Sequence, residues 1–118
     1  MEKLTHQEEE AMQAVWKTGE GSVKQFLDNM PSPGTPYTTL ASTIKNLERK
    51  EYLSSRMIGK TYLYKPLIGE EEYKKKFVSG FVKDYFQDSY KALVNFFVEE
   101  KKLSAKELKE IIDLIEKK

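Results

Sequence analysis

The chain has 118 residues, 39% of them hydrophobic and 33% charged, and its formal net charge is +1 at pH 7. This size and composition predict a small soluble protein with one or two compact units. The lack of cysteine excludes disulfides, thiolate metal sites and cysteine nucleophiles, and the single histidine, His6, excludes a histidine triad or multi-histidine metal site within one chain. With no glycine-rich phosphate loop either, we expect no cofactor, no metal site and no catalytic residue, which argues against an enzyme.

No apolar run approaches the ~20 residues of a membrane span. The first residues also lack the basic-then-apolar pattern of a secretory signal. We therefore expect a cytoplasmic protein without membrane insertion. Because the overall charge is nearly balanced, any attraction to a polyanion must come from a local cluster of cations.

Two helices are expected before residue 35. Thr5 and Glu8 have the spacing of a capping box at a helix start. The buried face of this helix is predicted from apolar residues at helical spacing: Ala11, Met12, Val15 and Trp16. Two glycines end it, and Ser22 is expected to cap a second helix from Val23 to Met30.

A third helix, residues 35–47, has two unlike faces. Thr35 is expected to cap it, and Pro36 to occupy its first position. The predicted buried stripe consists of Tyr37, Leu40, Ala41, Ile44 and Leu47. The opposite face carries short hydroxyls, an amide and one cation: Thr38, Thr39, Ser42, Lys45 and Asn46. Short polar side chains let a helix lie close to DNA, so this face favours DNA contact; a solvated, threonine-rich helix is the alternative.

A β-hairpin is expected next. In residues 54–66 two β-prone runs flank a Gly59-Lys60 turn. Helices, a polar-faced helix and a hairpin follow one another in a winged helix-turn-helix, where the hairpin is called the wing. Residues 45–66 contain six basic side chains and two acidic ones, so the positive charge is local. In the hairpin, we expect Arg56 and Lys60 to lie at the DNA.

Three amphipathic helices are predicted after residue 69. They carry more apolar side chains than about 45 residues can bury on themselves, so we expect them to pack against a second copy of the chain. The dimer contact is expected to include Tyr73, Phe77, Phe81, Leu93, Phe97, Leu108, Ile111 and Ile115. The predicted fold class is thus mainly α with a small β-hairpin: a winged-helix DNA-binding domain, residues 1–68, followed by a three-helix dimerisation module, residues 69–118.

With these motifs in view, the chain resembles the BlaI/MecI penicillinase-repressor family of bacterial winged-helix regulators. Tyr37-Thr38-Thr39-Leu40, followed by Ser42, matches the Tyr-Thr-Thr-Val-x-Thr recognition segment of that family. The segment Tyr64-Lys65-Pro66 resembles the end of its wing, and Leu93-Val94-Asn95-Phe96 resembles part of its dimerisation helices. Each motif is short, but together they occur in order over nearly the whole chain.

The resemblance implies a homodimer that binds an inverted-repeat operator and represses transcription. It assigns DNA contact to Thr38, Thr39, Ala41, Ser42 and Asn46. Many relatives carry a basic residue in place of Ala41 or an arginine in place of Asn46, so the operator sequence cannot be taken from them. Glu51 replaces the usual glycine at the helix exit, where a left-handed cap would cost roughly 1 kcal/mol.

The resemblance also implies a switch. In the β-lactam-responsive members, a membrane sensor protease triggers cleavage of an Asn-Phe bond in the dimerisation region. The matching bond here is Asn95–Phe96. Cutting it would remove apolar surface that holds two DNA-binding units together. The alternative is that Asn95 is an ordinary polar residue on a packed helix and that release has another cause.

A second function class stays open on the sequence alone. A winged helix also suits a protein-interaction module, with a purely structural wing and no sequence-specific DNA binding. The two differ in salt dependence. A DNA-binding protein loses affinity for duplex steeply as salt is added, whereas a protein adaptor shows no site preference.

Overall fold

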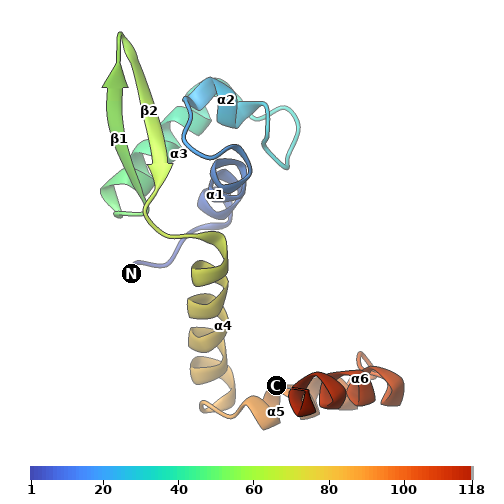
Figure 1. Cartoon of the computed structure of the whole chain (residues 1–118). Helices are drawn as coiled ribbons and strands as arrows, with labels where there is room; N and C mark the ends of the chain where they lie inside the picture. Colours follow the sequence, from blue (N-terminus) through green and yellow to red (C-terminus); the bar gives the residue numbers. More distant parts are fainter. Residues whose placement is uncertain (118) are drawn as a thin grey trace. The chain divides into compact units, whose positions relative to one another are not determined.

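The computed structural model describes residues 1–117, which form six helices and one antiparallel hairpin (Figure 1). In chain order these are α1 His6–Thr18, α2 Val23–Leu27, α3 Tyr37–Arg49, β1 Leu53–Ile58, β2 Thr61–Pro66, α4 Glu70–Phe86, α5 Tyr90–Glu99 and α6 Ala105–Glu116. The predicted fold class, mainly α with a small hairpin, is confirmed. Contacts along the chain group it into two compact units, Met1–Tyr73 and Lys74–Lys118.

Side chains cap four of these helices, and the caps of α1 and α2 are the ones predicted from the sequence. At α1, the Thr5 hydroxyl accepts from the Glu8 N–H at 3.1 Å, and the Glu8 carboxylate accepts from the Thr5 N–H at 2.8 Å. Ser22, Ser89 and Ser104 cap α2, α5 and α6 in the same way, each accepting from a backbone N–H three residues on. These bonds satisfy N–H groups that have no partner inside a helix.

The start of α3 differs from the prediction. Pro36 itself holds the cap position, with φ −65° and ψ 144°, and no side chain caps this helix. Thr35 was the predicted cap, but its hydroxyl donates to the carbonyl of Ser32 at 3.1 Å in the preceding turn. Proline supplies a suitable φ for the cap position and has no N–H that needs a partner. The helix therefore begins at Tyr37, one residue later than expected.

The inner face of α3 is also partly different. Leu40, Ile44 and Leu47 are buried as predicted, but Tyr37 is 52% exposed because it lies in the first turn, beyond the edge of the core. Thr43 is buried instead. It lies on the same face of α3 as Leu40, three residues before it, and Leu47, four residues after it. Its hydroxyl donates to the carbonyl four residues back at 2.9 Å, so no polar group is left without a partner there.

The core of the first unit lies between α1, α2, α3 and the inner face of the hairpin (Figure 1). Its largest fully buried side chains are Phe26, Met12, Leu40, Ile44, Leu47, Leu53 and Val15. The loop between α1 and α2 is joined to β2 by a pair of backbone hydrogen bonds between Gly21 and Tyr64, 3.0 and 2.8 Å long. Core packing thus positions α3 and the hairpin together.

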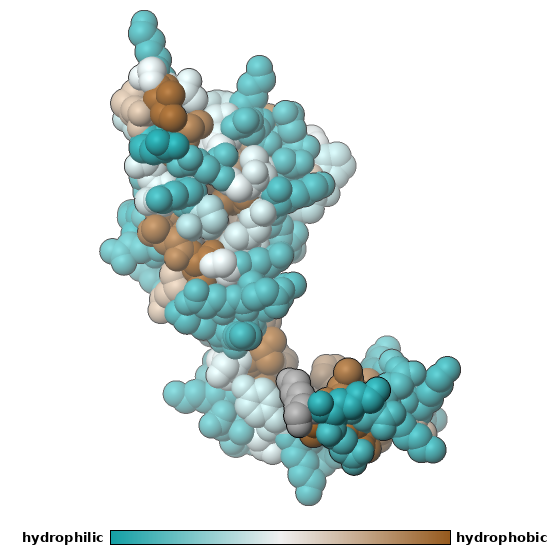
Figure 2. Space-filling model, viewed as in Figure 1, coloured by the Kyte–Doolittle hydropathy of each residue, from teal (hydrophilic) through white to brown (hydrophobic). Residues whose placement is uncertain are grey.

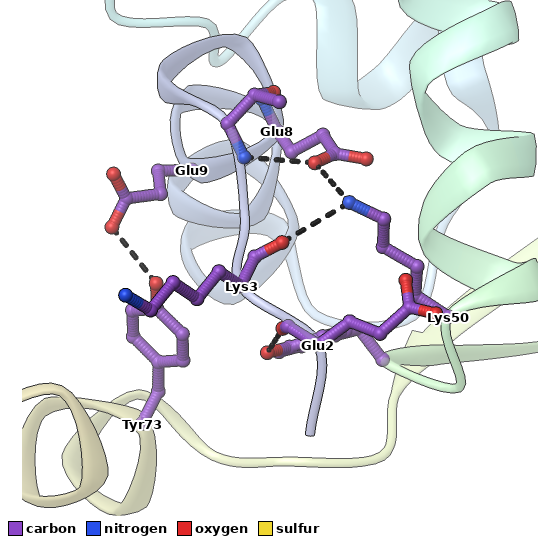
Figure 3. A network of polar contacts seen from close by, with 8 residues as sticks. Glu2, Lys3, Glu8, Glu9, Lys50 and Tyr73 are labelled. Carbon is purple, nitrogen blue, oxygen red and sulfur yellow. Dashed lines mark hydrogen bonds and ion pairs between the residues drawn. The ribbon is translucent and has the colours of Figure 1, made fainter. Parts of the chain in front are cut away.

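A polar network joins three separate segments of the first unit (Figure 3). Lys50, at the end of α3, donates to the Glu8 carboxylate at 2.7 Å and to the carbonyl of Lys3 at 3.1 Å. The Tyr73 hydroxyl of α4 donates to Glu9 at 2.8 Å. Burial alone would raise the pKa of the Glu8 carboxyl, but the Lys50 ammonium and a backbone N–H outweigh it and lower this pKa.

The first turn of α4 belongs to the first unit. The Tyr73 ring lies 5.5 Å from Trp16 and 6.1 Å from Tyr52 between centroids, and the Trp16 indole N–H donates to the carbonyl of Ile68 at 2.9 Å. These contacts explain why the two compact units divide after Tyr73, whereas the sequence pattern places the domain boundary after residue 68.

The second unit exposes most of its apolar side chains. Of its described residues, Val82 alone is buried. Phe81, Phe86 and Phe96 form a chain of ring contacts with centroids 5.8 Å apart at each step. The large apolar side chains left exposed are Phe77, Val78, Phe81, Tyr85, Tyr90, Val94, Phe96, Phe97, Val98, Ile111, Ile112, Leu114 and Ile115.

The strained exit of α3 generates a stability prediction. Glu51 has φ +67°, and the N–H groups of Glu51 and Tyr52 close a Schellman motif on Glu48 and Leu47. Because glycine adopts this conformation without steric cost, Glu51→Gly should raise the free energy of unfolding by about 1 kcal/mol. Glu51→Ala removes the same charge but keeps a Cβ, so it should give no such gain in a urea titration. Equal stabilisation by both variants would contradict the strain argument.

The lowered pKa of Glu8 generates a pH prediction. A carboxyl whose pKa is lower in the folded than in the unfolded state stabilises the fold above its ordinary value of 4.5. That stabilisation is lost as the pH falls through the folded pKa. Glu8→Gln should therefore lose ~1–3 kcal/mol at pH 7, and the gap to the unmodified chain should shrink below pH 4.5.

Urea unfolding at several pH values measures this gap. In a double-mutant cycle with Lys50→Met, the double variant should lose less stability than the sum of the losses of the two single variants. The reason is that removing both partners leaves no unpaired lysine ammonium at this site. A gap that does not change with pH would show that the ion pair contributes nothing.

Candidate nucleic-acid interface

The outer face of α3 is polar, short and exposed. Ser42 follows Thr38 by four residues, Lys45 and Asn46 follow Ser42 by three and four, and all four side chains are exposed. The structure therefore brings these four predicted residues together on one surface. Thr39 and Ala41, which were expected beside them, are half-buried at the two edges of this face, and Ala41 packs partly against the core.

Two contacts fix the hairpin beside this face. The Lys45 ammonium lies 5.7 Å from the centroid of the Tyr62 ring of β2, a cation–π contact worth ~0.5–1 kcal/mol at an exposed site. The Ser55 hydroxyl of β1 donates to the Glu48 carboxylate, one turn further along α3. Helix and hairpin thus form one continuous surface within the first unit.

Arg56, a predicted DNA contact, has a partner inside the chain. Its guanidinium donates two hydrogen bonds, 2.9 and 2.7 Å long, to the Glu20 carboxylate in the loop after α1. The same bonds lower the pKa of the Glu20 carboxyl. Since neighbouring residues of a strand point to opposite faces, Arg56 lies on the side of the hairpin away from Ser55. Lys60, the other predicted hairpin contact, is exposed in the turn.

The local positive charge is smaller than the sequence count suggests. Of the six basic residues between positions 45 and 66, Lys50 and Arg56 are held in ion pairs with acidic side chains of the same unit. The four basic side chains that are exposed, and for which no ion pair is seen in residues 1–117, are Lys45, Arg49, Lys60 and Lys65.

Sequence reasoning missed Tyr62. The alternation in β2 places Tyr62 and Tyr64 on the same face of the strand but does not show how far along the strand the core extends. The observed register pairs Tyr64 with Ser55 and Tyr62 with Met57, which places Tyr64 in the core and Tyr62, 49% exposed, beside α3. No local signal in the sequence distinguishes the two, because the choice depends on the contact of β2 with Gly21 and the core.

The predicted dimerisation residues have three kinds of environment. Tyr73 is half-buried in the first unit, in contact with Trp16 and Glu9. Leu93 and Leu108 are half-buried in the second unit. The remaining ones are exposed: Phe77, Phe81, Phe97, Ile111 and Ile115. Asn95 and Phe96, the predicted cleavage site, are consecutive exposed residues of α5.

The described part of the chain lacks two other kinds of feature. Residues 1–117 contain no group of three or more His, Asp or Glu side chains arranged to hold a metal ion. None of the helices in this range is long and apolar enough to cross a membrane.

Comparison with known proteins gives a consistent result. The profile of the penicillinase repressor family matches residues 4–117. The methicillin resistance regulatory protein MecI of Staphylococcus aureus (strain N315) is 25% identical over 98% of this chain and 95% of its own length, as is that of Staphylococcus epidermidis. The penicillinase repressor of Bacillus licheniformis is 22% identical over 97% of this chain and 90% of its own length. This chain belongs to the penicillinase repressor family.

Proposed function

We propose that this chain is a transcriptional repressor, not an enzyme, that binds an inverted-repeat DNA operator as a homodimer. The observation that carries the proposal is the exposed face of α3, on which Thr38, Ser42, Lys45 and Asn46 lie together beside the hairpin. Family membership supports the role of repressor.

The proposed DNA contact follows from the size of these side chains. Threonine and serine hydroxyls reach phosphates or base edges only when the helix backbone lies deep in a groove, and an α-helix fits the major groove of B-DNA. Asn46 provides an amide that can bond to an adenine edge, and Lys45 provides one cation for the phosphate backbone. With four exposed cations near the site, phosphate attraction is moderate, so selectivity depends on the α3 side chains.

The proposed homodimer follows from the second unit. Within the described residues of this unit, thirteen large apolar side chains are exposed in a single chain. A surface of this kind is typical of a face that another protein covers, and a copy of the same chain provides a self-complementary partner. Two DNA-binding units held together bind two half-sites, which can raise affinity 10²–10⁴-fold over one unit.

We also propose that release can occur by cleavage at Asn95–Phe96, after a signal from a membrane sensor protease. This bond lies within α5, and its cleavage would separate α6 and the last four residues of α5 from the DNA-binding unit. The apolar side chains lost in this way include Phe96, Phe97, Ile111 and Ile115. Operator binding would then lose its bivalent advantage.

The DNA contact is tested by selecting bound duplexes from a random pool at about 0.15 M salt, where specific binding exceeds non-specific binding by several orders of magnitude. We expect a palindromic site with half-site centres one or two helical turns apart. Ser42→Glu should abolish binding to that site, because its carboxylate would face phosphates. Gln13→Glu adds the same charge on α1 and should bind normally. Undiminished binding by Ser42→Glu would reject this face, and recovery of no duplex would favour a protein-interaction module.

The dimer is tested by light scattering. Phe81→Asp places a charge among the exposed apolar side chains of α4 and should yield monomers, with at least 100-fold weaker operator binding. Lys83→Asp changes an exposed polar position two residues along the same helix and should remain dimeric. A chain ending at Asn95 should behave like Phe81→Asp. An unchanged mass for Phe81→Asp and for the shortened chain would reject the assignment of the dimer to the second unit.

A further inference from the structure

The tip of the hairpin exposes apolar side chains that the core does not use. Met57 is 54% exposed and Ile58 is 52% exposed, and they lie opposite Tyr62 and Thr61 in the last two cross-strand pairs. Figure 2 shows hydrophobic surface gathered at this tip, with hydrophilic surface around it. An exposed apolar hairpin end invites aggregation unless a partner covers it, so these side chains point to a contact.

The tip continues the surface of α3. Cross-strand partners share a face of a hairpin, and every second residue returns to that face. Ser55 and Tyr64 face α3 and the core, so Met57 and Tyr62 face the same side one step further out. The Lys45 ammonium over the Tyr62 ring joins this step to the polar face of α3. A molecule that binds along that face therefore meets Met57 next.

The charge around the tip selects the kind of partner. From Tyr52 to Gly69 the chain contains three basic residues and no acidic one, and Lys60 lies in the turn itself. Arg56 is held by Glu20 on the opposite face. Apolar side chains next to a free cation suit the minor groove of DNA, whose sugar walls are apolar and whose edges are lined by phosphates. A second copy of this basic tip would instead be repelled.

The length of the hairpin also fits this partner. Thr61, the first residue of β2 and the one nearest the turn, lies three residue steps from the buried Tyr64, a span of about 10 Å at ~3.3 Å per step. The major groove is about 12 Å wide, so a hairpin beside a helix in that groove carries its tip across one phosphate strand. The adjacent minor groove lies beyond that strand.

We propose that the hairpin tip enters the minor groove beside each half-site as an apolar wedge guided by Lys60, with Met57 on the face that continues α3 and Ile58 on the opposite face of the tip. The proposal rests on the proposed function, since it requires α3 in the adjacent major groove. Tyr62 and Lys45 hold the wedge in line with α3. The wing then contributes through apolar contact and local DNA deformation, and its arginine is a structural residue.

The test compares the full-length chain with the double variant Met57→Ser, Ile58→Ser on the selected operator, with A·T pairs placed along both flanks. Dimethyl sulfate reports both grooves, because it methylates guanine N7 in the major groove and adenine N3 in the minor groove. We expect the double variant to bind about tenfold more weakly or worse with an unchanged salt slope, since no cation is removed. It should lose adenine N3 protection at the flanks and keep guanine N7 protection.

The matched control is Leu67→Ser, which removes another exposed apolar side chain of the first unit, away from the tip. It should bind and protect DNA like the unmodified chain, and all variants should share one circular dichroism spectrum. Normal affinity and N3 protection in the double variant would overturn the wedge while leaving the repressor intact. A changed mass in light scattering would overturn it in favour of a protein contact at the tip. If the unmodified chain selects no duplex, the repressor and the wedge are both rejected.

Discussion

The burial of one stripe of α3 is the constraint on which the rest of the first unit depends. Leu40, Ile44 and Leu47 are fully buried against α1, α2 and the hairpin, and each contributes ~1.5–3 kcal/mol by leaving water. If the sequence of α3 were shifted by one residue relative to the core, the stripe would rotate by about 100° around the helix axis and become exposed. The face that carries Ser42 and Asn46 is therefore held outward by the core, and not by contacts of its own. Binding side chains on such a rigid element can be exchanged for other short polar residues without loss of the fold.

Local interactions explain what the sequence predicts well. The capping pair Thr5 and Glu8, and its counterparts at Ser22 and Ser104, join residues three positions apart, so the pattern shows them directly. The outward face of α3 follows from its 3.6-residue period. Contacts between distant segments are different: Arg56 and Glu20 are 36 residues apart in sequence, and no spacing rule links them. The 3.6-residue period likewise places Tyr37 on the apolar face of α3. Its side chain is nevertheless exposed, because the core does not extend to the first turn of this helix.

The second unit shows the limit that size places on a hydrophobic core. Side chains cap α5 and α6, and its helices carry apolar side chains at helical spacing, yet within its described residues Val82 alone is buried. Three helices of this length enclose too little volume to cover their own apolar faces. Burial against a second chain would supply the missing core, and the stability of this unit would then depend on protein concentration. Association and folding of the second unit would become one process, so a cut in α5 would act on both.

The distribution of charge in the first unit bears on how selective it can be. Lys50 and Arg56 are neutralised by Glu8 and Glu20, which leaves fewer cations for phosphates than the sequence suggests. Each phosphate contact adds affinity for any duplex, so withdrawing two cations lowers non-specific binding more than it lowers discrimination between sites. In the proposed repressor, discrimination between sites would then come from the fit of short α3 side chains to base edges, together with the ease with which the flanking steps accept an apolar wing tip. Both depend on close approach rather than on charge, and close approach is what the small side chains of α3 and the uncharged side chains at the tip allow.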